Sequence, residues 1–222
     1  MEKLLVFMVM LASCYAETQD LSGKAFVFQS ETATDHVKLM TSKTNLSALT
    51  VCLRFKTALT RNYALFSLAT PAISNDFLLF KNKEEGVVKV HVRDAGADFM
   101  ALSVPPNAWH TVCTTWDSQD GTSQLWVDGK PTIKRFIHSG QPISDKPSTV
   151  LGQDQDNYGG GFETSQSFVG MMSRVHMWDY VLSPKEIQRY EEDSCFTPGN
   201  VFNWKALDYE VVGNILVEQE VM

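Results

Sequence analysis

The chain has 222 residues, of which 44% are hydrophobic and 20% are charged. This composition is typical of a globular protein and excludes the low-hydrophobicity, high-charge regime of intrinsic disorder. Its 19 Lys and Arg residues against 26 Asp and Glu residues give a net charge of −7, which argues against nucleic acid as the primary ligand, because phosphate backbones are bound by clustered Lys and Arg.

The N-terminus has the pattern of a secretory signal. After a short charged start, Leu4–Ala12 is apolar, and the small residues Cys14 and Ala16 fit the −3 and −1 positions of a cleavage site. The apolar run is too short to cross a bilayer, which needs about 20 residues. We therefore expect residues 1–16 to be a signal peptide rather than an anchor, and residues 17–222 to be a secreted, extracellular domain with no membrane span.

Short apolar or alternating runs recur through the rest of the chain, separated by turn-forming residues. They are rich in Val, Phe, Trp and Thr, which favour strands, and their spacing predicts an antiparallel all-β sandwich or barrel. Asp128-Gly129 is a type I′ hairpin signal, and Asp120-Gly121 is a second candidate. The expected strands are 25–28, 51–55, 63–68, 77–80, 87–92, 100–104, 110–116, 124–127, 150–152 and 175–178.

One short helix is predicted from Pro184 to Glu192. Ser183 is a good N-cap, Pro184 suits the first helical position, and Glu186 completes a capping box. Leu182 is placed to pack against Ile187 as a hydrophobic staple. A single helix on a β-sandwich is expected to cover an edge or a face.

Two covalent modifications are expected in a secreted chain. Cys52 and Cys113 lie in strand-like segments and share their phase with polar residues, which places both on the wetter face of a sheet and predicts a disulfide between them. Cys195, in a late loop, is then the odd cysteine. Asn45 begins the only N-x-S/T sequon, so we predict a glycan there, with an unmodified loop as the alternative.

The segment from residue 151 to 166 concentrates oxygen donors. Asp154, Asp156 and Glu163 lie within ten positions, Gln155 and Gln166 add neutral oxygens, and three glycines between them let the chain fold back. Converging carboxylates repel one another, and a hard cation removes that cost. Calcium takes six to eight oxygen ligands, and the segment has no His or Cys that would favour zinc. The residues therefore predict a calcium site, with a solvated polar turn as the alternative.

A catalytic interpretation starts from the same residues. Two carboxylates can act as acid and nucleophile in glycoside hydrolysis, and Asp154-x-Asp156 faintly resembles the pair of a sandwich-type glycosidase. Glu163, however, lies across a glycine loop rather than farther along a strand. No G-x-S-x-G, H-E-x-x-H or phosphate-cradling motif is present in the sequence, so we expect a protein that is not an enzyme.

Several segments together resemble the pentraxin family over about residues 24 to 217. They include 151–166, the run Met177-Trp178-Asp179-Tyr180-Val181-Leu182-Ser183-Pro184, the start Lys24-Ala25-Phe26-Val27-Phe28, both cysteine segments, Trp126-Val127-Asp128-Gly129-Lys130-Pro131 and Asn203-Trp204-Lys205-Ala206-Leu207. The resemblance implies a lectin-like two-sheet jelly roll, a homopentameric ring and two calcium ions per subunit. It also implies phosphocholine, phosphoethanolamine or carbohydrate ligands.

Residue by residue, the resemblance implies a ligand set. The calcium ligands would be Asn75 from a separate loop and Asp154, Gln155 (through its carbonyl), Asp156, Glu163 and Gln166. Phe80 would line an apolar pocket that packs against a choline methyl group.

Three positions depart from the family pattern. Ser74 stands where Asp is usual, so the first calcium is expected to bind more weakly unless Asp76 reaches in. Asp154 stands where Glu is common, which shortens the reach by one methylene. Thr111 stands where His is usual, with His110 displaced by one position.

The expected function is that of a calcium-dependent pattern-recognition protein of innate immunity and the acute phase. It would bind microbial or damaged-cell surfaces, and complement components are candidate partners. The alternative is a calcium-stabilised extracellular adhesion or structural module without a small-molecule ligand.

Overall fold

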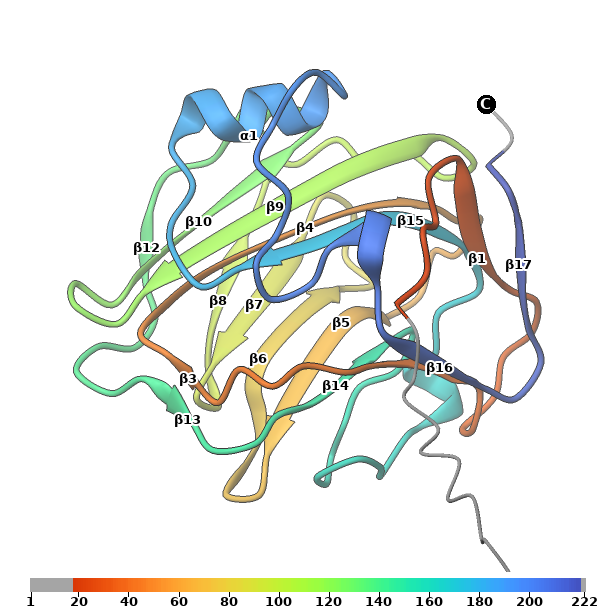
Figure 1. Ribbon diagram of the computed structural model, residues 1–222, viewed down its shortest axis with the longest axis horizontal. Helices are drawn as coiled ribbons and strands as arrows, with labels where there is room; N and C mark the ends of the chain where they lie inside the picture. Colours follow the sequence, from red (N-terminus) through yellow and green to blue (C-terminus); the bar gives the residue numbers. More distant parts are fainter. Residues whose placement is uncertain (1–17, 221–222) are drawn as a thin grey trace, which may run out of the picture.

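The computed structural model describes residues 18–220, which form two packed antiparallel sheets with one helix outside them (Figure 1). The eight-stranded sheet has the order β11-β10-β9-β4-β15-β1-β17, and β12 also pairs with β10. Its strands are β1 (Lys24–Phe28), β4 (Ala48–Lys56), β9 (Trp109–Asp117), β10 (Thr122–Val127), β11 (Lys130–Pro131), β12 (Arg135–Phe136), β15 (Gly170–Trp178) and β17 (Ile215–Gln219).

The seven-stranded sheet has the order β16-β2-β14-β5-β6-β7-β8, and β3 with β13 forms a separate two-stranded ladder. The strands of the larger set are β2 (His36–Leu39), β5 (Tyr63–Thr70), β6 (Ile73–Lys81), β7 (Val88–Val92), β8 (Ala95–Phe99), β14 (Ser148–Leu151) and β16 (Tyr209–Val212); the ladder pairs β3 (Asn45–Leu46) with β13 (Ile143–Ser144). The main hydrophobic core fills the space between the two sheets. The expected all-β sandwich with one short helix is confirmed.

A second, smaller core lies on the outer face of the eight-stranded sheet, beneath α1 (Pro184–Glu191). Cys52 and Cys113 pair directly across β4 and β9 and form the predicted disulfide. Both are buried beside Trp178 and Tyr190. The expectation of a wetter face is therefore wrong, because the helix excludes water from this part of the sheet.

The turn and capping signals behave as predicted. Ser183 and Glu186 form both hydrogen bonds of the capping box, and Leu182 and Ile187 are buried in the second core. Asp128 and Gly129 both have positive φ, as a type I′ turn requires, and they join β10 to β11.

One predicted strand is wrong. Residues 100–104 form an extended loop after β8, and Met100 is exposed while Ala101 has a φ of 60°. The actual strand lies just before it, at Ala95–Phe99, where three small residues and an Asp hid the alternation. The predicted signal peptide lies outside the described residues. Within those residues, no helix is long and apolar enough to cross a membrane.

Candidate functional site

The acidic segment forms a long loop between β14 and β15, closed at its base. The Phe168 N–H donates to the Gly152 carbonyl at 2.8 Å. Gly152 has a φ of 86°, and a Cβ there would lie 2.3 Å from the Phe28 ring. Glycine is therefore required where the loop leaves the sheet.

The Gln155 side chain anchors the loop to the seven-stranded sheet. Its amide Nε2 donates to the carbonyls of Ser67 and Ser148, each at 3.0 Å, and its Oε1 accepts from the Gly159 N–H at 3.0 Å. The Gln155 N–H also donates to Ser67 Oγ at 3.2 Å. Because the amide is fully buried and used in these bonds, a metal at this position would bind the Gln155 carbonyl, as the resemblance implies.

A tight reversal then returns the chain to the same place. Asn157 and Gly160 exchange two backbone hydrogen bonds, of 3.1 and 3.0 Å. Gly161 has a φ of 77°, and a Cβ there would lie 2.9 Å from the Asp156 Cβ. Glu163 then caps a single 3-10 turn, η1 (Thr164–Gln166), in which the Gln166 N–H donates to the Glu163 carbonyl.

The reversal brings the three predicted carboxylates within electrostatic reach of one another. Burial, and after it the charges of Asp156 and Glu163, raise the pKa of Asp154 to about 7. Burial also raises the pKa of Asp156, with Glu163 as the second cause. The charged form of the cluster is thus costly in the protein alone, which is the condition that a bound cation relieves.

Three of the predicted calcium ligands carry a buried oxygen with no hydrogen-bond partner. They are Asn75 Oδ1, Asp154 Oδ1 and Gln166 Oε1. A buried polar atom without a partner costs about 1–3 kcal/mol, so these oxygens fit a metal ligand set. Across residues 18–220, no three His, Cys, Asp or Glu side chains are gathered closely enough to hold a metal by themselves. A site here would need the amide and carbonyl oxygens to complete it.

Asn75 lies near the start of strand β6 rather than in a separate loop, which corrects that expectation. It is held by the β7–β8 turn, where the Asp94 N–H donates to the Asn75 carbonyl at 3.0 Å. Asp76 does not replace the missing acid at Ser74. Its buried carboxylate accepts from Thr70 Oγ1 at 2.6 Å and pairs with Arg93 at 3.4 Å.

Phe80 lies on the same outer face as the loop anchor. Ser67, which binds Gln155, pairs with Leu78 on β6, and Phe80 is two residues farther along that strand and half-buried. Its neighbours in register are Ala64 on β5 and Lys89 on β7. Lys89 pairs in turn with Asp98 on β8 and forms an ion pair with it at 3.5 Å.

Two residues that hold the loop were not predicted from the sequence. Ser67 lies in a strand that is buried throughout, so nothing local marks it as an anchor. Arg61 donates to the Ser167 carbonyl at 2.7 Å and to the Ser165 carbonyl at 3.3 Å, and pairs with Glu31 at 3.1 Å. These contacts join segments about 100 residues apart, and no local pattern reveals them.

Comparisons with known proteins match the chain to one family over almost its whole length. A model of the Pentaxin family matches residues 24–219. The chain is 42% identical to a C-reactive protein of Sus scrofa over 224 residues, 99% of each protein. It is 38% identical to a serum amyloid P-component of Sus scrofa over 225 residues, covering 100% of this chain and 99% of that protein. A native heptameric SAP-like pentraxin from Limulus polyphemus has the same fold, with a TM-score of 0.83 at 24% identity, covering 90% of this chain and 96% of the other.

Proposed function

The chain belongs to the Pentaxin family of non-enzymatic, lectin-like proteins, and from that premise we propose that it is a secreted, calcium-dependent recognition protein. Its ligands would be phosphocholine, phosphoethanolamine or carbohydrate groups on microbial or damaged-cell surfaces. The buried disulfide supports an extracellular location, because such bonds persist in oxidising compartments.

One observation carries the proposal. Buried, unpartnered oxygens of Asn75, Asp154 and Gln166 accompany two carboxyl groups, Asp154 and Asp156, whose pKa is raised by burial and by neighbouring negative charge. An ordinary polar turn satisfies its own oxygens by hydrogen bonds or exposes them to water. The combination of burial, like charge and unused oxygens instead favours binding of a hard, oxygen-seeking cation.

Different residues of the chain would anchor the loop and bind the metal. Gln155 fixes the loop to the sheet and leaves its carbonyl to the site, and the turn η1 carries Glu163 and Gln166. Calcium, when bound, would supply positive charge and open coordination positions for phosphate or sugar oxygens. An acidic protein could in that way bind an anionic group. Because Asp76 is engaged elsewhere, we expect the calcium position next to Ser74 to be the weaker one.

Repetition of the site would supply the strength of surface binding. The proposed assembly is a homopentamer that presents its sites together, and avidity then adds a factor of about 10² to 10⁴ on a repetitive surface. Complement components are proposed partners of a surface-bound ring. The glycosidase interpretation is set aside, because the family is non-enzymatic.

Calorimetric titration of the mature protein with calcium, with and without phosphocholine, tests the proposal. We expect two calcium ions per subunit in the wild type, and loss of at least one in Asp154→Asn. The matched control is Glu192→Gln, which removes an exposed acid beside α1 on the other sheet. Ligand binding that persists in chelator, or a calcium stoichiometry unchanged by Asp154→Asn, would refute the mechanism.

A further inference from the structure

A groove of about 490 Å³ lies on the outer face of the seven-stranded sheet, over β2, β14 and β16. Lys38 on β2 pairs in register with Val150 on β14 and with Glu210 on β16. Because Val37 and Leu39, its neighbours in the chain, belong to the core between the sheets, Lys38 lies on the outer face. The loop that follows β14 is anchored on β14 and β5, so it separates this groove from the predicted apolar pocket on β6.

The groove on β2 has an excess of cationic side chains. Lys38, Lys146 and His36 line it, and of the described residues in its lining only Glu210 is acidic. Both lysines are exposed, and no ion pair within residues 18–220 involves either of them. Two cationic side chains are therefore free to bind an anion here.

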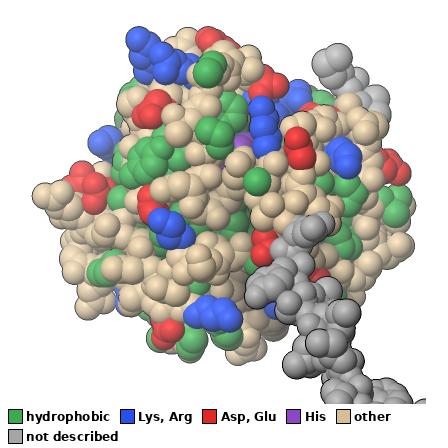
Figure 2. Space-filling view, in the orientation of Figure 1, with side chains coloured by type: hydrophobic (Ala, Val, Ile, Leu, Met, Phe, Trp, Pro, Cys, Tyr) green, Lys and Arg blue, Asp and Glu red, His purple; other side chains and the backbone are tan. Residues whose placement is uncertain are grey.

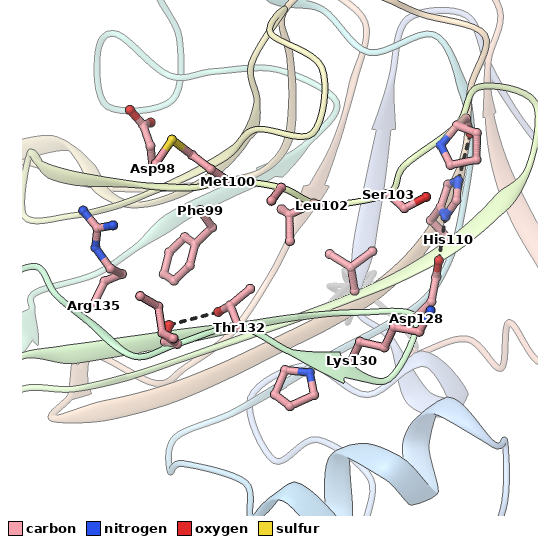
Figure 3. A pocket seen from close by; sticks show the side chains of 15 residues that line it. Asp98, Phe99, Met100, Leu102, Ser103, His110, Asp128, Lys130, Thr132 and Arg135 are labelled. Carbon is pink, nitrogen blue, oxygen red and sulfur yellow. Dashed lines mark hydrogen bonds and ion pairs between the residues drawn. The ribbon is translucent and has the colours of Figure 1, made fainter.

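This excess contrasts with other parts of the molecule, whose net charge is −7. On the face drawn in Figure 2, Lys and Arg side chains are interspersed with Asp and Glu. A larger groove of about 740 Å³, between the segment after β8 and the β10–β12 segment, combines Asp98 and Asp128 with Lys130 and Arg135 (Figure 3). A groove with balanced charges has no preference for an anion, whereas the groove on β2 does.

Contacts of two rings hold the walls of the groove on β2 in place. The Tyr158 hydroxyl, from the loop after β14, donates to the Lys146 carbonyl at 3.1 Å, and Tyr158 is 44% exposed. The His36 ring lies 4.8 Å from the Phe162 ring of the same loop, and its Nδ1 donates to the Thr34 carbonyl at 2.7 Å. Walls that are fixed before binding lower the entropic cost of holding a ligand.

The lining of this groove suits a sugar with an anionic ester. Tyr158 offers an exposed aromatic ring as an apolar wall. A Cβ at Gly159 would lie 3.6 Å from Ser148 Oγ, so the glycine leaves space above that hydroxyl. The two exposed cations are lysines, which act as point charges, whereas the fork of an arginine matches a planar carboxylate. Lysines therefore favour a compact oxyanion such as a sulfate or phosphate ester.

We propose that this groove binds a sugar that carries a sulfate or phosphate ester. Lys38 and Lys146 bind the ester oxygens, and Tyr158 packs against the sugar ring. None of these three residues is a predicted calcium ligand, so binding in the groove does not require the metal. The inference thus goes beyond the proposed function and does not rest on it.

Fluorescence anisotropy of a labelled chondroitin sulfate tetrasaccharide, added to the mature protein in chelator, tests the proposal. We expect saturable binding that weakens with added salt, because salt screens exposed charges. Lys38→Gln/Lys146→Gln should weaken binding at least about tenfold, since two charge-assisted contacts are lost. Glu210→Gln should tighten it about threefold, because the acid repels the ester. Competition by glucose 6-sulfate and glucose 6-phosphate shows which ester is preferred, and glucose should not compete.

The matched control is Lys185→Gln/Lys205→Gln, which removes two exposed lysines from α1 and from the turn η2 (Trp204–Ala206) and should bind as the wild type does. Thermal unfolding checks that each variant folds. A wild type that does not bind in chelator, or equal affinities of the wild type and Lys38→Gln/Lys146→Gln, would overturn the inference. So would equally tight binding of the unsulfated tetrasaccharide or of an Asp-rich peptide. Failure of the calcium titration would refute the proposed function alone, because saccharide binding is measured without calcium.

Discussion

The two outer faces of the sandwich are covered in opposite ways. On the eight-stranded sheet, α1 seals a disulfide, Trp178 and Tyr190 into a dry second core. On the seven-stranded sheet, the 152–169 loop buries the Asp154 carboxylate and leaves one oxygen of Asp154 and the amide oxygen of Gln166 without hydrogen-bond partners. A sealed apolar face stabilises the fold, whereas unpartnered oxygens cost free energy unless a ligand meets them. The stabilising face and the proposed recognition site thus lie on separate sheets.

Removal of the fully buried tryptophan of the helix-covered face should show this separation most strongly. Trp178 is fully buried, and its indole N–H donates to the Thr197 carbonyl at 3.0 Å. Trp178→Ala should lower the free energy of unfolding by about 3–5 kcal/mol, the usual cost of such a cavity. Urea unfolding in chelator measures it, and calorimetry of the folded variant should give the wild-type calcium affinity within about twofold. A parallel loss of calcium binding would contradict the separation.

Removal of the disulfide is a second test of how the helix-covered face stabilises the fold. Cys52 and Cys113 are 61 residues apart, so their bond restricts a long loop in the unfolded chain. Cys52→Ala/Cys113→Ala should cost about 3–4 kcal/mol of unfolding free energy. Cys195→Ser, at an exposed free thiol, is the control and should cost nothing measurable. If both variants unfold at the wild-type urea concentration, the bond does not brace this face.

The sequence predicts the helix-covered face better than the loop-bearing face. The helix, its capping box and the disulfide are encoded locally, in Ser183, Pro184, Glu186 and the phase of two strands. The packing of α1 over the cysteines was not predicted. The alternation of a strand shows on which face of the sheet a side chain lies, but not which element packs against that face.

The acidic loop was found because its carboxylates are close in the chain, but its anchoring was not. Ser67 is 88 residues from Gln155, and a serine inside a buried strand gives no sign that it will bind an amide. The edge strands β16 and β17 were also missed, as was β2, which lies beside β16. The partly exposed, mixed residues of β16 and β17 lack the alternation that marks a half-buried strand. Strand β2 does alternate, but it has only four residues.

Acid should weaken the helix-covered face. Burial, and after it the charges of Arg174 and Lys205, lower the pKa of His176 to about 3. The folded state therefore binds fewer protons than the unfolded chain, and stability falls as the pH drops from 6.5 toward 3. Between pH 6.5 and 5 the loss from this group is about 2 kcal/mol.

The measurement compares the wild type with His176→Gln by urea unfolding at several pH values. The comparison is needed because Asp154 acts with the opposite sign: its pKa is raised, so protonation as the pH falls through about 7 favours the folded state. The variant should lose stability less steeply in acid than the wild type. Equal slopes would show that His176 does not couple to folding.

The smallest expected effects concern ligand choice on the loop-bearing face. Phe80 can pack against a trimethylammonium group, a contact worth about 0.5–1 kcal/mol at a partly exposed site. Phe80→Ala should therefore weaken phosphocholine binding about fivefold while calcium affinity stays the same. Lys89, its neighbour in register, opposes a cationic head group and is only partly neutralised by Asp98 at 3.5 Å.

Lys89→Gln should accordingly tighten phosphocholine binding by about threefold, within the range of a partly exposed charge interaction, and should leave binding of a neutral sugar unchanged. Competition calorimetry with phosphocholine, phosphoethanolamine and a neutral sugar separates these cases. If Phe80→Ala changes none of the three affinities, the apolar pocket has no role in recognition. The loop would then be a calcium-stabilised module for adhesion, and the division between a stabilising face and a ligand-selecting face would hold only for the metal.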